Sequence, residues 1–205
     1  MNNKGLIKGN TPIRYDKEGT SNPIAKFLVN QFKLSIYNLL CSYDIKSILD
    51  VGCGKGEIIS YLSSMDNYEI HGVDIEHDVI ERASSLYPNF NLTVQDAKNL
   101  SYGNASFDLI LVLEVLEHVE HYEEIIREAG RVSREYCIFS VPREPIWRIL
   151  NLIRGAHVRS IGNTPGHINH WSSNQFINLI SNYFDIIKVS KPIPWTIILC
   201  KKKNV

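Results

Sequence analysis

The segment Ile48–Ile58, with the sequence ILDVGCGKGEI, constrains the fold of this chain more than any other part of it. An apolar run that is typical of a β-strand leads into glycines at alternate positions, Gly52, Gly54 and Gly56, and a helical pattern follows. Glycine adopts backbone angles that are closed to other residues and leaves room for a ligand close to the main chain. The segment therefore predicts a strand, a tight turn and a helix, with a ligand above the carboxyl end of the strand.

The spacing of these glycines separates two kinds of nucleotide ligand. A dinucleotide-binding turn carries its third glycine three positions after the second, where pyrophosphate reaches a helix N-terminus. Here that position is Glu57, whose carboxylate repels a pyrophosphate. Asp50, the acidic residue beside the turn, suits a cationic ammonium group better than an anion. We therefore expect a nucleoside ligand without phosphates.

Further acidic residues follow two other predicted strands. Asp74 ends the run Glu69–Val73, and Asp96 follows the run Asn91–Gln95. Strands that alternate with helical patterns predict βαβ units and a parallel sheet, in which the carboxyl ends of the strands meet at one edge. Asp50, Asp74 and Asp96 are therefore expected to line one crevice, although Asp96 also suits the role of a turn or capping residue.

These positions, together with the run Phe107–Val119 (FDLILVLEVLEHV), resemble the motifs of the class I S-adenosylmethionine-dependent methyltransferases, over residues 47–141. The resemblance implies an α/β three-layer sandwich with a seven-stranded, mostly parallel sheet of order 3-2-1-4-5-7-6, whose last strand is antiparallel. It also implies an N-terminal helix, a helical cap insertion and S-adenosylmethionine as the cofactor. The residues implied to bind the cofactor are Asp50, Gly52, Cys53, Gly54, Gly56, Asp74, Ile75, Asp96, Ala97 and Glu114.

The resemblance implies particular roles for some of these residues. Asp74 is implied to accept hydrogen bonds from both ribose hydroxyls, and Asp96 to contact the adenine amino group beside the main chain of Ala97. The run that ends in Glu117 and His118 is implied to border the methyl-transfer site, with His118 as a base or orienting residue. A surface or capping position is the alternative for Glu117 and His118.

The whole chain, residues 1–205, is expected to form one methyltransferase domain. Asn22 before Pro23 predicts the start of its N-terminal helix. The polar segment 9–21 before it is either a flap over the cofactor or a tail. Apolar residues every four positions give that helix one stripe, made of Ile24, Leu28, Phe32, Ile36 and Leu40. The expected parts are the flap and helix (1–45), the cofactor-binding core (46–141), the substrate-cap insertion (142–182) and the C-terminal hairpin (183–205).

The insertion is expected to determine the choice of acceptor. It begins with a predicted helix over Ile146–Arg154, which Gly155 ends. This helix either covers the active site and grips an amphiphilic or anionic acceptor, or is an ordinary amphipathic helix. Its apolar face is Trp147, Leu150 and Ile153, and the nearby arginines are Arg143, Arg148, Arg154 and Arg159.

A polar loop, Asn163–Trp171 (NTPGHINHW), follows the predicted helix and precedes another one near Ser173. Its His167 and His170 are candidates to accept a proton from the acceptor, because imidazole titrates near neutral pH. A structural role, with each ring bonded to the backbone, is the alternative. No metal is expected, because two histidines alone rarely form a site and this loop carries no carboxylate at ligand spacing.

Composition limits the partners. The chain has 22 basic and 22 acidic residues and a net charge of zero, so no global positive field attracts nucleic acid, and none is expected as a partner. The four cysteines include no CxxC pair, and no apolar stretch reaches the length of a transmembrane segment. We expect a cytoplasmic protein that can touch a membrane surface, while the oligomeric state stays open.

Together these observations predict transfer of a methyl group from S-adenosylmethionine to a small-molecule acceptor, such as a metabolite, a sugar or a lipid-linked intermediate. The histidines favour an oxygen atom as the acceptor. Two alternatives stay open. One is a domain that binds the cofactor without catalysis, and the other is an NAD-dependent oxidoreductase on the same topology, which Glu57 disfavours.

Overall fold

The structure is a computed structural model, and it describes residues 22–153 and 160–203. The predicted flap, residues 9–21, lies outside the described residues, as do Arg154, Gly155 and Arg159 of the predicted cap. Within the described ranges, no helix combines the length and the apolar character that crossing a membrane requires.

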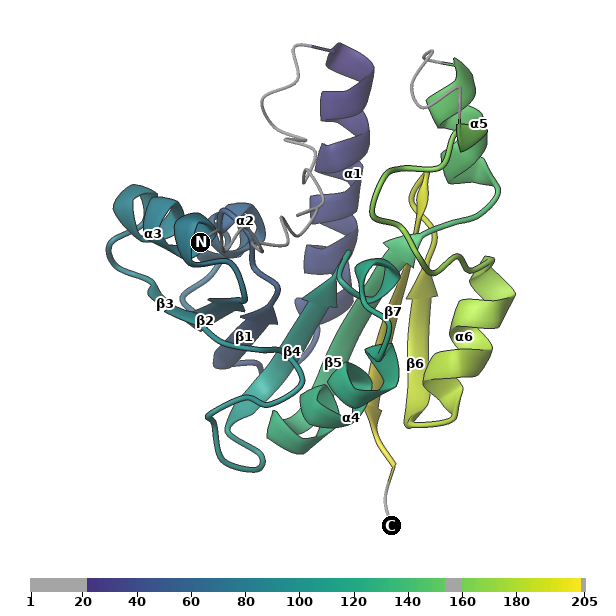
Figure 1. The fold of residues 1–205 in the computed structure, drawn as a ribbon. Helices are drawn as coiled ribbons and strands as arrows, with labels where there is room; N and C mark the ends of the chain where they lie inside the picture. The colour runs from purple at the N-terminus through teal and green to yellow at the C-terminus, as the bar shows by residue number, and fades with distance from the viewer. Residues whose placement is uncertain (1–21, 154–159, 204–205) are drawn as a thin grey trace, which may run out of the picture.

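A single seven-stranded sheet forms the centre of the molecule (Figure 1). Its strands are β1 Ser47–Val51, β2 Glu69–Asp74, β3 Asn91–Val94, β4 Phe107–Leu113, β5 Ser133–Pro142, β6 Phe184–Ser190 and β7 Trp195–Lys202. They lie in the order β3-β2-β1-β4-β5-β7-β6. Only β7 runs antiparallel to its neighbours β5 and β6. Order and direction confirm the predicted fold.

Helices cover both faces of this sheet and give the fold three layers (Figure 1). They are α1 Pro23–Leu40, α2 Glu57–Ser63, α3 His77–Leu86, α4 Tyr122–Val132, α5 Ile146–Ile153 and α6 Ser173–Ser181, with a 3-10 turn, η1, over Leu116–His118. Buried residues of α1, α2 and α3 share one apolar core with the sheet. Those of α4 and α6 share a second core on the opposite face.

The first helix begins where the sequence predicts. The side-chain oxygen of Asn22 accepts a hydrogen bond from the backbone N–H of Ile24 at 2.9 Å and so caps α1. Phe32, Ile36 and Leu40 of the predicted stripe are buried. Ile24 is 68% exposed, because the first half of α1 extends past the sheet (Figure 1). The apolar pattern therefore located the helix but not the length of its covered part.

The C-terminal elements also follow local sequence signals. Ser172 and Gln175 form a capping box at the start of α6, in which the Gln175 side chain accepts a hydrogen bond from the Ser172 backbone N–H at 2.9 Å. The predicted hairpin is the antiparallel pair β6 and β7. The capping box joins residues that are three positions apart, and the hairpin joins two consecutive strands.

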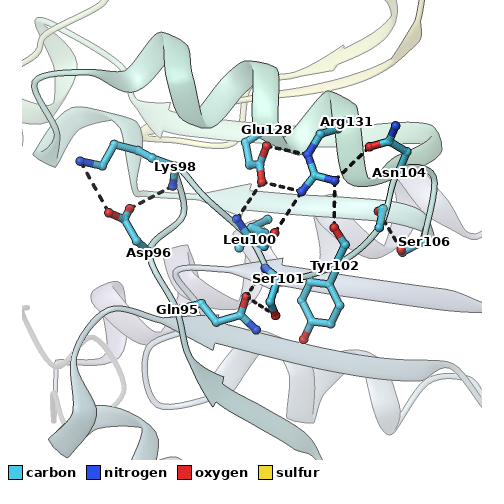
Figure 2. Close-up of polar contacts among 11 residues, drawn as sticks. Gln95, Asp96, Lys98, Leu100, Ser101, Tyr102, Asn104, Ser106, Glu128 and Arg131 are labelled. Atoms are coloured by element: carbon cyan, nitrogen blue, oxygen red, sulfur yellow. Dashed lines mark hydrogen bonds and ion pairs between the residues drawn. The ribbon is translucent and has the colours of Figure 1, made fainter.

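One arginine fastens the loop between β3 and β4 to α4 (Figure 2). Arg131 donates hydrogen bonds to both carboxylate oxygens of Glu128, at 2.8 and 2.6 Å, and to the backbone carbonyls of Leu100 and Tyr102. Glu128 also accepts a hydrogen bond from the Leu100 backbone N–H at 2.7 Å. The hydrogen bonds from Arg131 hold the pKa of Glu128 below its usual value. This network fixes the loop that carries Asp96 at its other end.

Candidate functional site

The glycine-rich turn between β1 and α2 has the backbone geometry that its sequence predicts. Gly52, Gly54 and Gly56 all have positive φ angles, of 77°, 55° and 79°. The backbone N–H groups of Gly52 and Cys53 donate to the carbonyl of Val73 at the end of β2, so that the turn lies against the neighbouring strand. Gly56 is the N-cap residue of α2, and a Cβ there would lie 3.1 Å from the ring of Tyr87, which would have to shift slightly.

Asp74 joins this turn to the end of β2. Its Oδ2 accepts a hydrogen bond from the Gly54 backbone N–H at 2.9 Å, and its Oδ1 accepts one from the Glu76 backbone N–H at 3.2 Å. Asp50 lies on the neighbouring strand β1, where it pairs with Gly72 of β2, and both acidic residues are almost fully buried. The structure thus brings the first two predicted acids to one edge of the sheet.

Two cavities adjoin at this edge. The first lies among the glycine-rich turn, η1, α1, α5 and the loop after it, and the second lies at the ends of β2 and β3. Gly52 and His118 line both cavities, which therefore meet at these residues. Among the predicted cofactor residues, Asp50, Gly52, Cys53, Gly54 and Glu114 line the first cavity, and Gly52, Asp74, Ile75, Asp96 and Ala97 line the second.

Asp96 makes contacts that are typical of a turn residue, the role that the sequence allowed as an alternative to cofactor binding. Its Oδ1 accepts a hydrogen bond from the Lys98 backbone N–H at 3.0 Å, and its Oδ2 lies 3.6 Å from the ammonium nitrogen of Lys98 (Figure 2). The side chain is 44% exposed. Asp96 therefore stabilises its own loop and borders the second cavity at the same time.

Glu114 follows β4 with a positive φ of 59°. Its Oε1 accepts a hydrogen bond from the hydroxyl of Ser140 at 3.2 Å, and its Oε2 accepts one from the indole N–H of Trp195 at 2.7 Å. These two donors hold the carboxylate at the wall of the first cavity, which Trp195 also lines. Trp195 is a site residue that was not predicted, because its contact with Glu114 joins positions that are far apart in the sequence.

The structure brings His118 and His167 together. Their ring centres lie 4.8 Å apart with the rings nearly perpendicular, and both residues line the first cavity. Glu117 lines the same cavity and is only 2% exposed, so the surface position that the sequence allowed for it is wrong. Its burial follows from η1, which turns Glu117 inward beneath the loop that carries His167. The structure therefore excludes the surface alternative for Glu117 and places its carboxylate at the wall of the first cavity.

His170 does not join this group. It is not among the described residues that line the first cavity, and its Nε2 donates a hydrogen bond to the side-chain oxygen of Asn163 at 2.7 Å. Burial lowers its pKa, and the positive charge of Arg148 lowers it further. These contacts favour the structural alternative for His170, and we do not retain it as a candidate base.

The cap differs from its prediction in what it buries. Trp147 lines the first cavity and donates from its indole N–H to the hydroxyl of Thr164 at 2.8 Å. Ile153 is 77% exposed, so the predicted apolar face is only partly packed. Arg148 lies 3.5 Å from Glu144, a residue of the cap itself, instead of facing the cavity with a free charge. Burial raises the pKa of Glu144 despite this arginine.

The sequence and the fold both match known methyltransferases. Residues 49–140 match the family described as "Methyltransferase domain". Norajmaline N-methyltransferase from Rauvolfia serpentina is 32% identical over 94 residues, which cover 43% of this chain and 32% of that protein. Ubiquinone biosynthesis O-methyltransferase from Coxiella burnetii is 24% identical over 182 residues, 78% of this chain and 76% of that protein. The chain spans about a third of the length of several curated relatives that it matches, the norajmaline enzyme among them.

A solved structure shows the same fold. Magnesium protoporphyrin IX methyltransferase from Synechocystis PCC 6803, with bound SAH, superposes with a TM-score of 0.66 and 18% identity, over 91% of this chain and 90% of that one. Residues 49–140 match this methyltransferase-domain family, and the strand order and the acidic residues at the strand ends resemble those of the class I S-adenosylmethionine-dependent methyltransferases.

Proposed function

We propose that this protein transfers the methyl group of S-adenosylmethionine to a hydroxyl oxygen of a small-molecule acceptor. The observation that carries the proposal is the meeting of the two cavities at Gly52 and His118. The second cavity offers acidic groups to a nucleoside. The first adjoins it at these two residues, and its wall holds two histidines, where an acceptor would face the methyl group.

The residues of the second cavity fit a nucleoside. Asp74 lines the second cavity, where backbone N–H groups of Gly54 and Glu76 hold its carboxylate in place, and a carboxylate is a suitable acceptor for ribose hydroxyls. Ile75 is 65% exposed at the cavity wall, where its apolar surface suits a planar base. Asp96 and the main chain of Ala97 lie next to it, in the place proposed for the adenine amino group.

The residues of the first cavity fit the reacting end. The bound cofactor supplies a methyl carbon on a positively charged sulfur that leaves as a neutral thioether, so the protein needs no covalent nucleophile. Asp50 and Glu114 place negative charge near this end and suit its ammonium and sulfonium groups. Trp147 and Trp195 add aromatic walls that align an acceptor and exclude water.

The choice of oxygen depends on the histidines. A hydroxyl must lose its proton during methyl transfer, whereas an amine only has to arrive neutral. His118 and His167 are the imidazoles at the chamber wall, and they are placed to assist this loss. Relatives named as N- and as O-methyltransferases both match this chain, so the acceptor atom is our proposal.

All four cysteines are free thiols, which supports the inferred cytoplasmic location.

Calorimetric titration with S-adenosylmethionine, its demethylated product and NADH tests the cofactor half of the proposal. We expect saturable binding of the first two and none of NADH. The substitution Asp74→Ala should weaken binding by about a hundredfold or more, since it removes two hydrogen bonds to a charged group that contribute about 1.5–3 kcal/mol each. Asp78→Ala is the matched control, because this acid lies on α3 with its side chain 89% exposed. Equal loss in both variants would contradict the proposed ribose site.

Mass spectrometry of acceptor mixtures tests the other half. Pairs of compounds that differ only in carrying a hydroxyl or an amine are incubated with the protein and labelled cofactor, beside bulk tRNA. We expect label on the hydroxyl compounds. Label only on amines would overturn the choice of oxygen, label on tRNA would overturn the small-molecule acceptor, and cofactor binding without any transfer would favour a non-catalytic domain.

A further inference from the structure

Three side chains at the wall of the first cavity form a group with the composition of a metal site. Glu117, His118 and His167 each place one ligand atom within 4.8 Å of the other two. We propose that these residues bind a divalent transition-metal ion, and that the acceptor hydroxyl coordinates to this ion during methyl transfer. The second part rests on the proposed function, whereas the first does not.

The tautomer of His118 suits a ligand. Its Nδ1 lies 3.0 Å from the backbone carbonyl oxygen of Gly166. Because a carbonyl oxygen only accepts, Nδ1 carries the proton and the lone pair is on Nε2. Histidines that bind metals usually donate their other ring N–H to a carbonyl or a carboxylate in this way. The Nε2 atom is the one that faces the Glu117 carboxylate.

The distance between these two atoms also fits a shared ion. His118 Nε2 and Glu117 Oε1 lie 3.9 Å apart, which is longer than a hydrogen bond. Two ligand atoms that each lie about 2.1 Å from one metal ion are separated by roughly 3–4 Å. Glu117 is 2% exposed and His167 is 8% exposed, and a buried carboxylate is stabilised by a paired cation.

The backbone holds the two contributing segments together. The carbonyl of Glu117 accepts hydrogen bonds from the backbone N–H groups of Ile168 and Asn169, at 2.9 and 3.1 Å. The Asn169 side chain donates to the carbonyls of Leu116 and Val119, at 3.0 and 2.6 Å. The loop with His167 is thus docked on η1, and the three ligands are positioned before any ion arrives. The sequence does not indicate this group, because Glu117 lies about fifty residues before His167 and the two meet only in the fold.

The donor set defines the class of ion. Two imidazole nitrogens and one carboxylate oxygen favour Zn²⁺, Co²⁺, Fe²⁺ or Mn²⁺ over the hard ions Mg²⁺ and Ca²⁺. Three protein ligands leave further coordination positions open. His118 lies where the two cavities meet, so an open position of the ion faces the chamber that we propose for the acceptor.

A second group, His77, Asp78 and Glu81 on α3, has similar composition but none of these features. All three residues are exposed, and they lie on one helix surface. Exposed groups of this kind are common without an ion. It serves as the internal control for adventitious binding.

The ion gives the histidines a role in methyl transfer. A hydroxyl bound to a divalent cation has a lowered pKa and releases its proton to water near neutral pH. The resulting metal-bound oxygen forms a bond to the methyl carbon, the carbon–sulfur bond breaks, and its electron pair stays on sulfur. His118 and His167 then act as ligands instead of proton acceptors.

Titration of the chelator-treated protein with Co²⁺ tests the binding site directly. We expect saturable growth of visible d–d absorption at one equivalent, as nitrogen ligands enter the coordination sphere. His118→Gln and His167→Gln should each raise the Kd for Co²⁺ by about a hundredfold or more. His170→Gln and His77→Gln should leave it unchanged. No saturable binding, or binding lost only in His77→Gln, would overturn the proposal.

A measurement on the unmodified protein covers the case in which a ligand variant fails to fold. Bound Co²⁺ should shift the exchangeable N–H protons of two imidazoles far outside the usual proton NMR range, and added Zn²⁺ should remove these shifts by displacement. Shifted signals from no histidine, or from one only, would contradict a two-histidine site. Circular dichroism and S-adenosylmethionine binding show which variants are folded.

Activity then separates the two proposals. Once an acceptor is identified, chelation should abolish transfer without changing cofactor affinity, and Zn²⁺ or Mn²⁺ should restore it. Full transfer by the metal-free protein would overturn the acceptor-binding role of the ion. Cofactor binding without Co²⁺ binding contradicts only this inference, and Co²⁺ binding without cofactor binding contradicts only the proposed function.

Discussion

Two glutamates, each with an arginine neighbour, have pKa values that shift in opposite directions. Glu128 belongs to the cofactor-binding core and has a lowered pKa, whereas Glu144 belongs to the cap and has a raised one. Their side chains are equally covered, with 12% and 13% exposed. The contacts differ, since Arg131 donates to both oxygens of Glu128 at 2.6 and 2.8 Å, while Arg148 lies 3.5 Å from Glu144.

The comparison shows that hydrogen-bond geometry decides whether a covered carboxylate stabilises this fold. Burial disfavours the ionised form of both glutamates. Only the short, two-point contact of Glu128 with Arg131 outweighs it. The core therefore contains an ion pair that contributes to stability, and the cap contains one that costs stability at neutral pH. Substitutions in the two regions should then have effects of different size and sign.

The largest effect is expected from Arg131→Ala. It leaves Glu128 partly buried without its main partner and removes donors from the carbonyls of Leu100 and Tyr102. Breaking a buried pair costs about 3–5 kcal/mol, and because Arg131 is 33% exposed we expect the free energy of unfolding to fall by about 2–3 kcal/mol. Urea denaturation measures it.

Arg134→Ala is the control for loss of an arginine as such. Arg134 pairs with Asp108, but its side chain is 56% exposed, and surface pairs contribute about 0–1 kcal/mol. Equal destabilisation by the two substitutions would contradict the special position of Arg131, and with it the contrast between core and cap.

A smaller effect with a distinct pH dependence is expected from Glu128→Gln. Because folding lowers its pKa, ionised Glu128 stabilises the fold above its unfolded-state pKa of about 4.3. This contribution is lost as the pH falls through the lower folded-state pKa. The variant should therefore be about 1–2 kcal/mol less stable at neutral pH and should approach the parent protein in acid. Urea denaturation at a series of pH values tests this, and a difference that does not change with pH would assign the loss to packing.

The parts of this molecule that could be predicted from sequence share a physical basis. Asn22 caps α1, Ser172 pairs with Gln175, and the glycines from Gly52 onward open a tight turn. In each case the interacting groups lie within a few positions, so that spacing alone reports the contact. We predicted the strand order from a resemblance of whole motifs, and the sheet confirms that order. The family match over residues 49–140 covers the same motifs.

The features that escaped prediction depend on partners from distant segments. Glu117 is buried beneath the loop whose backbone N–H groups, at Ile168 and Asn169, donate hydrogen bonds to its carbonyl oxygen. The sequence near Glu117 does not indicate that this loop covers it. The contacts of Arg131 with the loop before β4 also join distant segments and appear only in the fold. Helical periodicity likewise cannot report that Ile153 lies on a face left uncovered.

The smallest effect, and the sharpest test of the comparison, is expected from Glu144→Gln. Because folding raises its pKa, Glu144 contributes stability that is fully present below about pH 4.3 and is lost as the pH rises through the folded-state pKa. Removing the charge should therefore leave the protein equally stable in acid and equally or more stable at neutral pH, by up to about 1 kcal/mol. Urea denaturation of Glu144→Gln and Glu128→Gln in parallel measures whether each substitution raises or lowers the free energy of unfolding. If Glu144→Gln lost stability at neutral pH, Arg148 at 3.5 Å would outweigh burial after all, and the cap would be held by its charges in the same way as the core.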